Sequence, residues 1–228
     1  MYALKNEDLS DKAYSAIKTM ILKGDLVPGV KLYQEKLAEN LGISRTPLNS
    51  ALNQLEKEML VESLPRRGFN VKKLSLKELL DLYDVRLRLE PLGARQAAEN
   101  RDPGLLKQCR NLQTEYERIL SRKITPDFRE LDYGFHNLIM AMSGNVFLQK
   151  MISSYNIISL GNLQLFMKSE GFPKKTDDSL HEHQEILGYI ISHLPEEAES
   201  AMFSHIQGTR NFLEREAEKE NHGETEKR

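Results

Sequence analysis

The sequence predicts a mainly α-helical protein with two domains, residues 1–74 and residues 75–228. Apolar residues recur at helical spacing through most of the chain, and capping residues, glycines and prolines separate these stretches. Alternation of apolar and polar residues, which is typical of strands, is clear only between residues 60 and 71. A chain of 228 residues is long enough for two domains that each bury a core of their own.

The composition favours a soluble, cytoplasmic protein with no membrane partner. Hydrophobic residues make up 39% of the chain, and no apolar run approaches the roughly 18 residues of a membrane span. The charged N-terminus lacks the pattern of a secretion signal. Because Cys109 is the single cysteine, any metal site must use histidines and carboxylates. Residues 1–74 carry 12 basic against 9 acidic side chains, a small excess that fits a polyanion partner.

Three helices are expected in the N-terminal domain. Residues 10–23 repeat apolar positions at helical spacing. Residues 33–42 and 43–60 form two further helices, joined by a tight turn at Gly42, and Ser44 is the expected N-cap of the second of them. A short helix, a glycine turn and a second helix predict a helix-turn-helix.

A small β-hairpin follows, because residues 60–71 alternate on either side of a turn from Pro65 to Gly68. The domain is therefore predicted to be a winged helix-turn-helix. The second helix of such a pair fits the major groove of DNA, where polar side chains near its start reach bases and phosphates. The candidates are Ser44, Arg45, Thr46, Asn49 and Ser50 in the helix, and Arg66, Arg67 and Gly68 in the wing. A winged helix that contacts protein is the alternative.

The C-terminal domain is predicted to be an antiparallel bundle of six helices. Local signals place the helix starts: a capping box from Ser75 to Glu78, a cap followed by proline at Asp102 and at Thr125, and a cap at Asn145. The expected helices are residues 76–99, 103–122, 126–142, 146–168, 178–193 and 196–218. The charged last residues, from Glu214 onward, lack an apolar stripe and are expected to fray.

Asp132 and His136 stand one helical turn apart in an otherwise apolar helix. The buried stripe of this helix is expected to consist of Leu131, Phe135, Leu138 and Met142, with Asp132 and His136 along its border. A carboxylate and an imidazole in this position indicate either a buried polar pair or half of a metal site.

Two further histidines are expected to face the interior. His183 aligns with the apolar residues of its helix, whereas His181 points outward, and His205 lies on the apolar side of the last helix. Pro195 marks the turn between these two helices, so antiparallel packing brings His183 and His205 to nearly the same level. Together with Asp132 and His136 they suit a divalent ion such as zinc, nickel or manganese. The alternative is a set of hydrogen-bonded core residues.

The N-terminal sequence resembles the DNA-binding domain of GntR-family bacterial transcription regulators. The resemblance rests on the segments ILKGDLVPG, LAENLGISRTP and PRRGF. It implies that Arg45 and Thr46, and Arg67 with Gly68 in the wing, contact the operator. The chain departs from the family pattern where Asn49 replaces a usual arginine and Met59 replaces a common glycine.

Residues 76–215 resemble the FCD ligand-binding domain of the FadR-like subfamily. The segments DVRLRLEPLGARQAA, LDYGFHNLI, HEHQEIL and MFSHI carry this resemblance. It implies a metal held by Asp132, His136, His183 and His205, next to a small carboxylate effector. It also makes Arg86 a candidate partner of the effector carboxylate, because a guanidinium can bind one through two hydrogen bonds. The alternative role of Arg86 is a packing or surface salt bridge.

The sequence therefore predicts a transcription regulator whose affinity for double-stranded operator DNA depends on a carboxylate effector bound near a divalent metal. A palindromic operator read by a homodimer is expected, because two half-sites raise both affinity and specificity. Two alternatives stay open: a metal-dependent hydrolytic enzyme, in which the metal activates water, and a regulator whose metal is purely structural.

Overall fold

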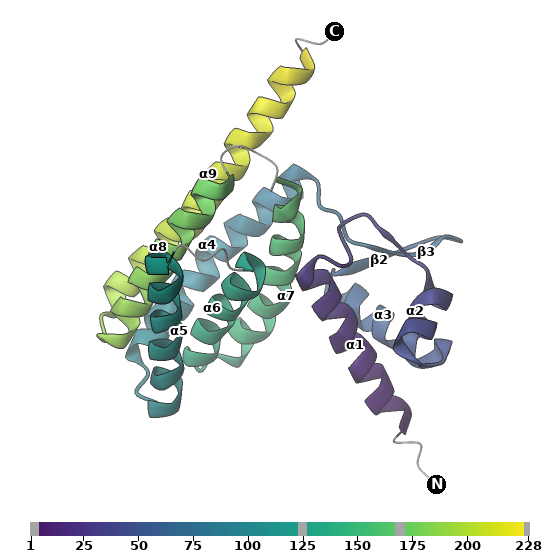
Figure 1. Cartoon of the computed structure of the whole chain (residues 1–228), viewed down its shortest axis with the longest axis horizontal. Helices are drawn as coiled ribbons and strands as arrows, with labels where there is room; N and C mark the ends of the chain where they lie inside the picture. Colours follow the sequence, from purple (N-terminus) through teal and green to yellow (C-terminus); the bar gives the residue numbers. More distant parts are fainter. Residues whose placement is uncertain (1–4, 123–126, 167–171, 226–228) are drawn as a thin grey trace. The chain divides into compact units, whose positions relative to one another are not determined.

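The computed structural model describes residues 5–122, 127–166 and 172–225 (Figure 1). These residues divide into two compact units. The first holds the described residues up to Leu74 together with Ile157–Gln164, and the second holds Ser75–Asn156 and the described residues from Leu165 onward. In the described part of the chain, no helix is long and apolar enough to cross a membrane.

Three helices form the core of the first unit: α1 (Lys5–Lys23), α2 (Gln34–Leu41) and α3 (Arg45–Lys57). α1 and α3 pack together, and each presents a buried apolar face with helical spacing. In α1 this face includes Ala13, Ile17 and Ile21, and in α3 it consists of Pro47, Leu48, Ala51, Leu52 and Leu55. The turn between α2 and α3 follows Gly42, whose φ of 65° is the left-handed conformation that favours glycine.

The predicted hairpin is present as β2 (Val61–Leu64) and β3 (Gly68–Val71), which pair in antiparallel fashion. A third strand, β1 (Lys31–Leu32), pairs with β3, so the sheet order is β1-β3-β2. β1 was not predicted from the sequence, because two residues are too few to show alternation. Together the three helices and the sheet make the predicted winged helix-turn-helix.

The second unit is an all-helical bundle, as predicted (Figure 1). α4 lies against α6, α8 and α9, and α8 lies against α5 and α9. The helices that follow Leu74 are α4 (Leu76–Glu99), α5 (Pro103–Arg122), α6 (Phe128–Met142), α7 (Val146–Leu163), α8 (Phe172–Ile191) and α9 (Pro195–Thr225), with a short 3-10 helix at Gln164–Phe166. Of these, the part of α7 from Ile157 onward and Gln164 belong to the first unit.

Local capping signals set most of the helix starts in this unit. Ser75 and Glu78 form the predicted capping box at α4. Asp102 accepts a hydrogen bond from the amide of Leu105 at the start of α5, and Asn145 accepts two from the first turn of α7. The cap predicted at Thr125 and Pro126 lies outside the described residues.

Two helices are longer than the sequence analysis predicted. α8 starts at Phe172 instead of residue 178, and the ring of Phe172 packs against Phe212 of α9 with 6.3 Å between ring centroids. α9 continues to Thr225 instead of residue 218. The last segment lacks an apolar stripe, but it is rich in glutamate, which is a strong helix former.

The end of α3 is strained at Met59, where the GntR pattern has a common glycine. The amides of Met59 and Leu60 bond back to the carbonyls of Glu56 and Leu55, which is the hydrogen-bond pattern of a Schellman cap. This cap places Met59 at φ 61°, in the left-handed region. A side chain in that conformation costs roughly 1–2 kcal/mol, and the side chain of Met59 is 51% exposed and gains little from packing.

We therefore expect Met59→Gly to raise the free energy of unfolding by about 1 kcal/mol, because the relief of strain exceeds the added freedom of the unfolded chain. Urea denaturation followed by circular dichroism measures the change. Met59→Ala keeps the β-carbon and serves as the control, with no gain expected. A less stable Met59→Gly protein would show that the methionine side chain contributes more than its conformation costs.

Candidate nucleic-acid interface and metal centre

The side chains predicted to contact DNA at the start of α3 are all exposed. They are Ser44, Arg45, Thr46, Asn49 and Ser50. Because the apolar face of α3 is buried against its own unit, the helix offers a polar face and an accessible N-terminal end, as a recognition helix needs. Ser44 occupies the N-cap position, but its side chain makes no capping hydrogen bond. The predicted N-cap position is therefore confirmed, although the hydroxyl does not bond to the first turn.

Two side-chain contacts join α2 to this polar face. The Nε2 atom of Gln34 donates a hydrogen bond to Oδ1 of Asn49 at 2.6 Å, and the guanidinium of Arg45 pairs with Glu35. Asn49 thus links the two helices where the family usually places a cation. The Arg45–Glu35 pair is exposed and therefore weak, so a phosphate can replace Glu35 at little cost.

The wing exposes both of its arginines. The amide of Arg67 bonds to the carbonyl of Leu64 at 2.9 Å and closes a tight turn over Pro65 and Arg66. Arg66 at φ 61° and Gly68 at φ 84° complete the reversal of the chain. Arg66 and Arg67 are exposed at the tip, where cations reach phosphates most easily.

In the helical unit, Asp132 and His136 lie at the buried centre of α6 and not along its border. Asp132 is 6% exposed and His136 is fully buried, whereas Leu131 and Leu138 are only half-buried. The predicted stripe was therefore rotated from the real one. Apolar periodicity could not find it, because the two residues at its centre are polar.

His183 of α8 and His205 of α9 bring their rings to the same place. Nε2 of His183 lies 3.1 Å from Nε2 of His205 and 3.7 Å from Oδ1 of Asp132. Nε2 of His136 lies 3.7 Å from Oδ2 of Asp132. One ligand atom from each of the four residues lies within 4.8 Å of the other three, and all four residues are buried. His181 is exposed, as predicted.

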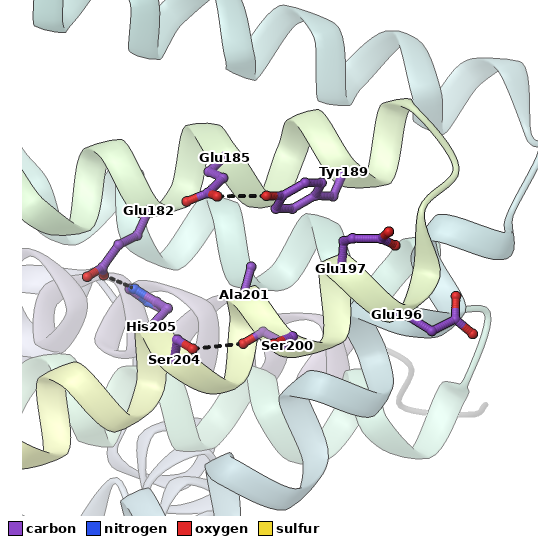
Figure 2. Close-up of a pocket in the computed structure, with 9 residues that line it drawn as sticks. All are labelled: Glu182, Glu185, Tyr189, Glu196, Glu197, Ser200, Ala201, Ser204 and His205. Atoms are coloured by element: carbon purple, nitrogen blue, oxygen red, sulfur yellow. Dashed lines mark hydrogen bonds and ion pairs between the residues drawn. The ribbon is translucent and has the colours of Figure 1, made fainter.

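In two of these rings, a carboxylate contacts Nδ1, which is the outer nitrogen because Nε2 faces the other ligands. Nδ1 of His136 contacts Oε2 of Glu90 from α4. Nδ1 of His205 lies 2.6 Å from Oε2 of Glu182, at one end of an open groove between α8 and α9 (Figure 2). Because a carboxylate only accepts hydrogen bonds, Nδ1 of His205 is the donor to Glu182, and a neutral ring then keeps its lone pair on Nε2.

The third ring is positioned by aromatic residues. The hydroxyl of Tyr116 from α5 lies 3.1 Å from Nδ1 of His183, and the ring of Phe135 stacks on His183 with 3.7 Å between centroids. Burial raises the pKa of Tyr116, and nearby Asp132 raises it further, so the phenol stays protonated. The orientation of His183 is thus fixed from two sides.

The electrostatics of the cluster favour neutral imidazoles at His183 and His205. Burial lowers the pKa of His183 well below its usual range, and the rings of His205 and His136 lower it further. Burial also lowers the pKa of His205, against the opposing effect of Glu182. His183 and His205 are thus in the neutral form in which histidines bind metal, and their Nε2 atoms lie close together beside Asp132.

The donor set therefore fits a divalent metal ion. Two ligands about 2.1 Å from one ion are separated by roughly 3.0 Å at right angles and roughly 3.4 Å at a tetrahedral angle. The Nε2 atoms of His183 and His205 are 3.1 Å apart, and two lone pairs at that distance repel unless a cation or a proton lies between them. Three histidines whose outer nitrogens are held by neighbours have the arrangement usual around protein-bound metals.

Arg86 lies next to this cluster and is almost completely buried. Its Nε atom donates to Oε1 of Glu90 at 2.5 Å, and its Nη2 atom lies 3.5 Å from Nε2 of His136. Burial alone would raise the pKa of Glu90, but Arg86 and His136 outweigh it and hold the pKa at about 2. The salt bridge foreseen as the alternative role of Arg86 exists, and it is internal and adjacent to the cluster.

The residues that support the four candidate ligands were not predicted from the sequence. They are Glu90, Tyr116, Glu182 and Lys175. Nζ of Lys175 lies 3.2 Å from Oε2 of Glu182. Two of them had a local signal. Glu90 follows Arg86 by one helical turn, and Glu182 directly precedes His183. Tyr116 had none, because its helix meets α8 only in the folded bundle.

Comparisons with known proteins agree with this architecture. Residues 9–71 match the gntR family of bacterial regulatory proteins, and residues 81–208 match the FCD domain. The chain belongs to the GntR family of DNA-binding transcription regulators and carries an FCD domain. The family and its curated relatives are regulators and not enzymes, which answers the alternative of a hydrolytic enzyme.

Two relatives match along most of the chain. The uncharacterized HTH-type transcriptional regulator YdhC of Bacillus subtilis (strain 168) is 26% identical over 194 residues, which cover 85% of each chain. The HTH-type transcriptional repressor GlaR of Escherichia coli (strain K12) is 24% identical over 204 residues, 85% of this chain and 90% of the relative. The solved structure of E. coli McbR/YncC covers 92% of this chain and 98% of its own with a TM-score of 0.78, and at 20% identity it shows the fold alone.

The buried ion pair in the FCD domain generates a test of stability. Arg86 and Glu90 are 3% and 0% exposed, so removal of one partner leaves the other charge buried without the opposite charge of this pair. We expect Glu90→Gln to lower the free energy of unfolding by about 3 kcal/mol, measured by urea denaturation. Asp81→Asn, which breaks the exposed pair with Lys77, is the control and should cost less than about 1 kcal/mol.

The double variant Arg86→Met/Glu90→Met should lose less stability than the sum of the two single changes, because neither charge is then left alone. Additive losses would mean that the two side chains stabilise the bundle independently of each other.

Proposed function

We propose that this GntR-family regulator binds its operator as a homodimer through residues 1–74, and that a carboxylate effector bound at a metal centre in residues 75–228 modulates this binding. The convergence of Asp132, His136, His183 and His205 beside a buried arginine carries the proposal. A core without function gains nothing from four polar side chains directed to one point.

In this proposal α3 enters the major groove of the operator. Arg45 and Thr46 at its start, with Asn49 and Ser50 one turn later, reach base edges and phosphates. The wing places Arg66 and Arg67 on the flanking backbone, and Gly68 lets the chain turn closely there. Because Asn49 replaces the arginine that is usual in the family, Arg45 and the wing contribute a larger share of the affinity for DNA.

The metal would be held by Asp132 and by Nε2 of His136, His183 and His205. Zinc, nickel and manganese all suit one carboxylate and three imidazoles. When bound, the ion supplies positive charge and open coordination positions for an anionic ligand. Glu90, Tyr116 and Glu182 keep the rings in the orientation that this requires.

A carboxylate effector fits the same place, because Arg86 adds a fixed guanidinium beside the ligands. Its Nη2 atom lies 3.5 Å from Nε2 of His136, and Glu90 occupies its Nε side. Arg86 therefore places positive charge beside the candidate ligands, where it can attract an effector carboxylate. The metal and Arg86 together would recognise one carboxylate from two directions.

Effector binding changes operator affinity only if the effector favours one arrangement of the dimer over another. The two-fold dimer is proposed because two recognition helices read two half-sites of a palindrome. The remaining alternative, a purely structural metal, differs in one respect. Metal removal would then lower stability, but no carboxylate would change operator binding.

The DNA interface is tested with an operator duplex selected from random sequence. We expect Arg45→Ala and Arg67→Ala each to weaken binding. Where the lost contact is to a phosphate, the slope of log K against the logarithm of the salt concentration should become shallower by about one unit. Fluorescence anisotropy at several salt concentrations measures both, and sedimentation of the complex should show two protein chains per duplex. Arg118→Ala, an exposed arginine of α5, is the control. Unchanged affinity in both wing and helix variants would contradict the assignment.

The metal site is tested by elemental analysis of protein exposed to zinc, nickel and manganese and then freed of loosely bound ions. We expect Asp132→Ala, His183→Ala and His205→Ala each to lose most of the bound metal. His181→Ala changes an exposed histidine two residues from His183 and should keep its metal. Equal metal content in all four variants and in the unaltered protein would leave the cluster with a structural role alone.

A further inference from the structure

Asn156 on α7 is the one fully buried amide side chain in the described residues whose two polar atoms both lack a hydrogen-bond partner. Buried polar groups are nearly always paired, because an unpaired one loses its bonds to water without replacement. An asparagine at this position is therefore less favourable in the ligand-free protein than a leucine of similar size. The unpaired amide of Asn156 is therefore a candidate contact for a ligand that binds beside it.

Asn162 on the same helix shows the usual solution. It is 2% exposed, and its Oδ1 atom accepts from the amide of Leu74 at 2.9 Å while its Nδ2 atom donates to the carbonyl of Ile158 at 2.9 Å. Both ends of that amide are used within the protein. The unpaired state of Asn156 is thus specific to its position.

Helix register places Asn156 at the level of the candidate metal ligands. A β-carbon added at Gly93 of α4 would lie against the Sδ atom of Met140 and 3.8 Å from Cδ1 of Leu148, so α4, α6 and α7 meet there. α6 and α7 are joined by a three-residue turn and run in opposite directions (Figure 1). Eight residues back along α6 is Asp132, and eight residues forward along α7 is Asn156, about 12 Å away in each case.

A residue of α4, Arg86, lies at the same level as Asp132 and Asn156. Arg86 precedes Gly93 by seven residues, which is two helical turns and returns to the same face. On α7, Leu148 meets Gly93, and Ile152 and Asn156 follow it at four-residue spacing on the same side of the helix, where all three are buried. Arg86, Asp132 and Asn156 therefore come from three helices to one level of the bundle.

We propose that Asn156 is a specificity-determining residue for the effector, and that the effector carries a hydroxyl group as well as its carboxylate. The inference rests on the proposed function, which supplies the carboxylate and its partners. An unpaired amide at the same level of the bundle as a guanidinium and four candidate metal ligands carries it.

The chemistry of the amide selects the hydroxyl. Asn156 offers an N–H donor and a carbonyl acceptor side by side, and both lack partners. A carboxylate only accepts hydrogen bonds and would leave Oδ1 unpaired. A hydroxyl accepts from Nδ2 and donates to Oδ1, so a hydroxy-carboxylate satisfies both atoms while its carboxylate meets Arg86.

Matched pairs of acids test this inference: lactate with propionate, malate with succinate, and citrate with tricarballylate. Members of a pair differ only by the hydroxyl. Calorimetry on the metal-loaded full chain should show that at least one hydroxy acid binds ten-fold or more tightly than its partner. Asn156→Leu should reduce that ratio to within about two-fold.

Gln96→Leu is the control, because Oε1 of Gln96 is also buried and unpaired but lies ten residues along α4 from Arg86. It should keep the preference for the hydroxy acid. The ligand-free Asn156→Leu protein should also melt at a higher temperature, because an unpaired amide has been removed. A lower melting temperature would show that the amide is satisfied internally, for example by a trapped water, and would overturn the inference.

The outcomes separate this inference from the function on which it rests. If carboxylates bind and change operator affinity, but Asn156→Leu keeps the preference for the hydroxy acid, only the inference is wrong. If no acid of the six binds, or none changes operator affinity, the proposed effector class fails and the inference fails with it.

Discussion

The buried chain of contacts from Arg86 through Glu90 to His136 is the interaction on which the FCD domain depends. All three side chains are at most 3% exposed, and they join α4 to α6. Charges in such a place are tolerated only when each is paired with good geometry. The need to pair these buried charges fixes which sides of α4 and α6 face each other. The contact with Glu90 then directs Nε2 of His136 toward Asp132.

The rest of the centre is built by the same logic, with one supporting residue for each histidine. α4 supplies Glu90, α5 supplies Tyr116 and α8 supplies Glu182. A ligand bound at this cluster would therefore contact side chains whose positions are set by several helices of the bundle. A small shift of one helix displaces the helices packed against it, because a close-packed core transmits displacement.

The covalent path from this centre to the wing is short. α4, which carries Arg86 and Glu90, starts at Leu76, and β3 of the wing ends at Val71. The capping box at Ser75 fixes the first turn of α4. A regulator that senses a ligand with α4 thus has its sensing helix only a few residues from an element proposed to contact DNA.

The sequence by itself determined the helices whose ends are coded locally. Ser75 with Glu78, Asp102 and Asn145 act on backbone groups within a few residues, so their effect is readable without the fold. The strand β1 and the true extent of α8 and α9 were missed. They depend on pairing with β3, on the contact of Phe172 with α9, and on helix propensity in the absence of an apolar stripe.

The sequence also indicated which histidines face inward, because helical period assigns a residue to a face. Only the tertiary structure decided what each face meets. It moved Asp132 and His136 from the border of α6 to its centre, and it brought Tyr116 against His183, 67 residues away. It also left the amide of Asn156 without a partner. Periodicity reports the direction of a side chain from its own helix, whereas hydrogen bonding depends on residues that other helices bring to the same level.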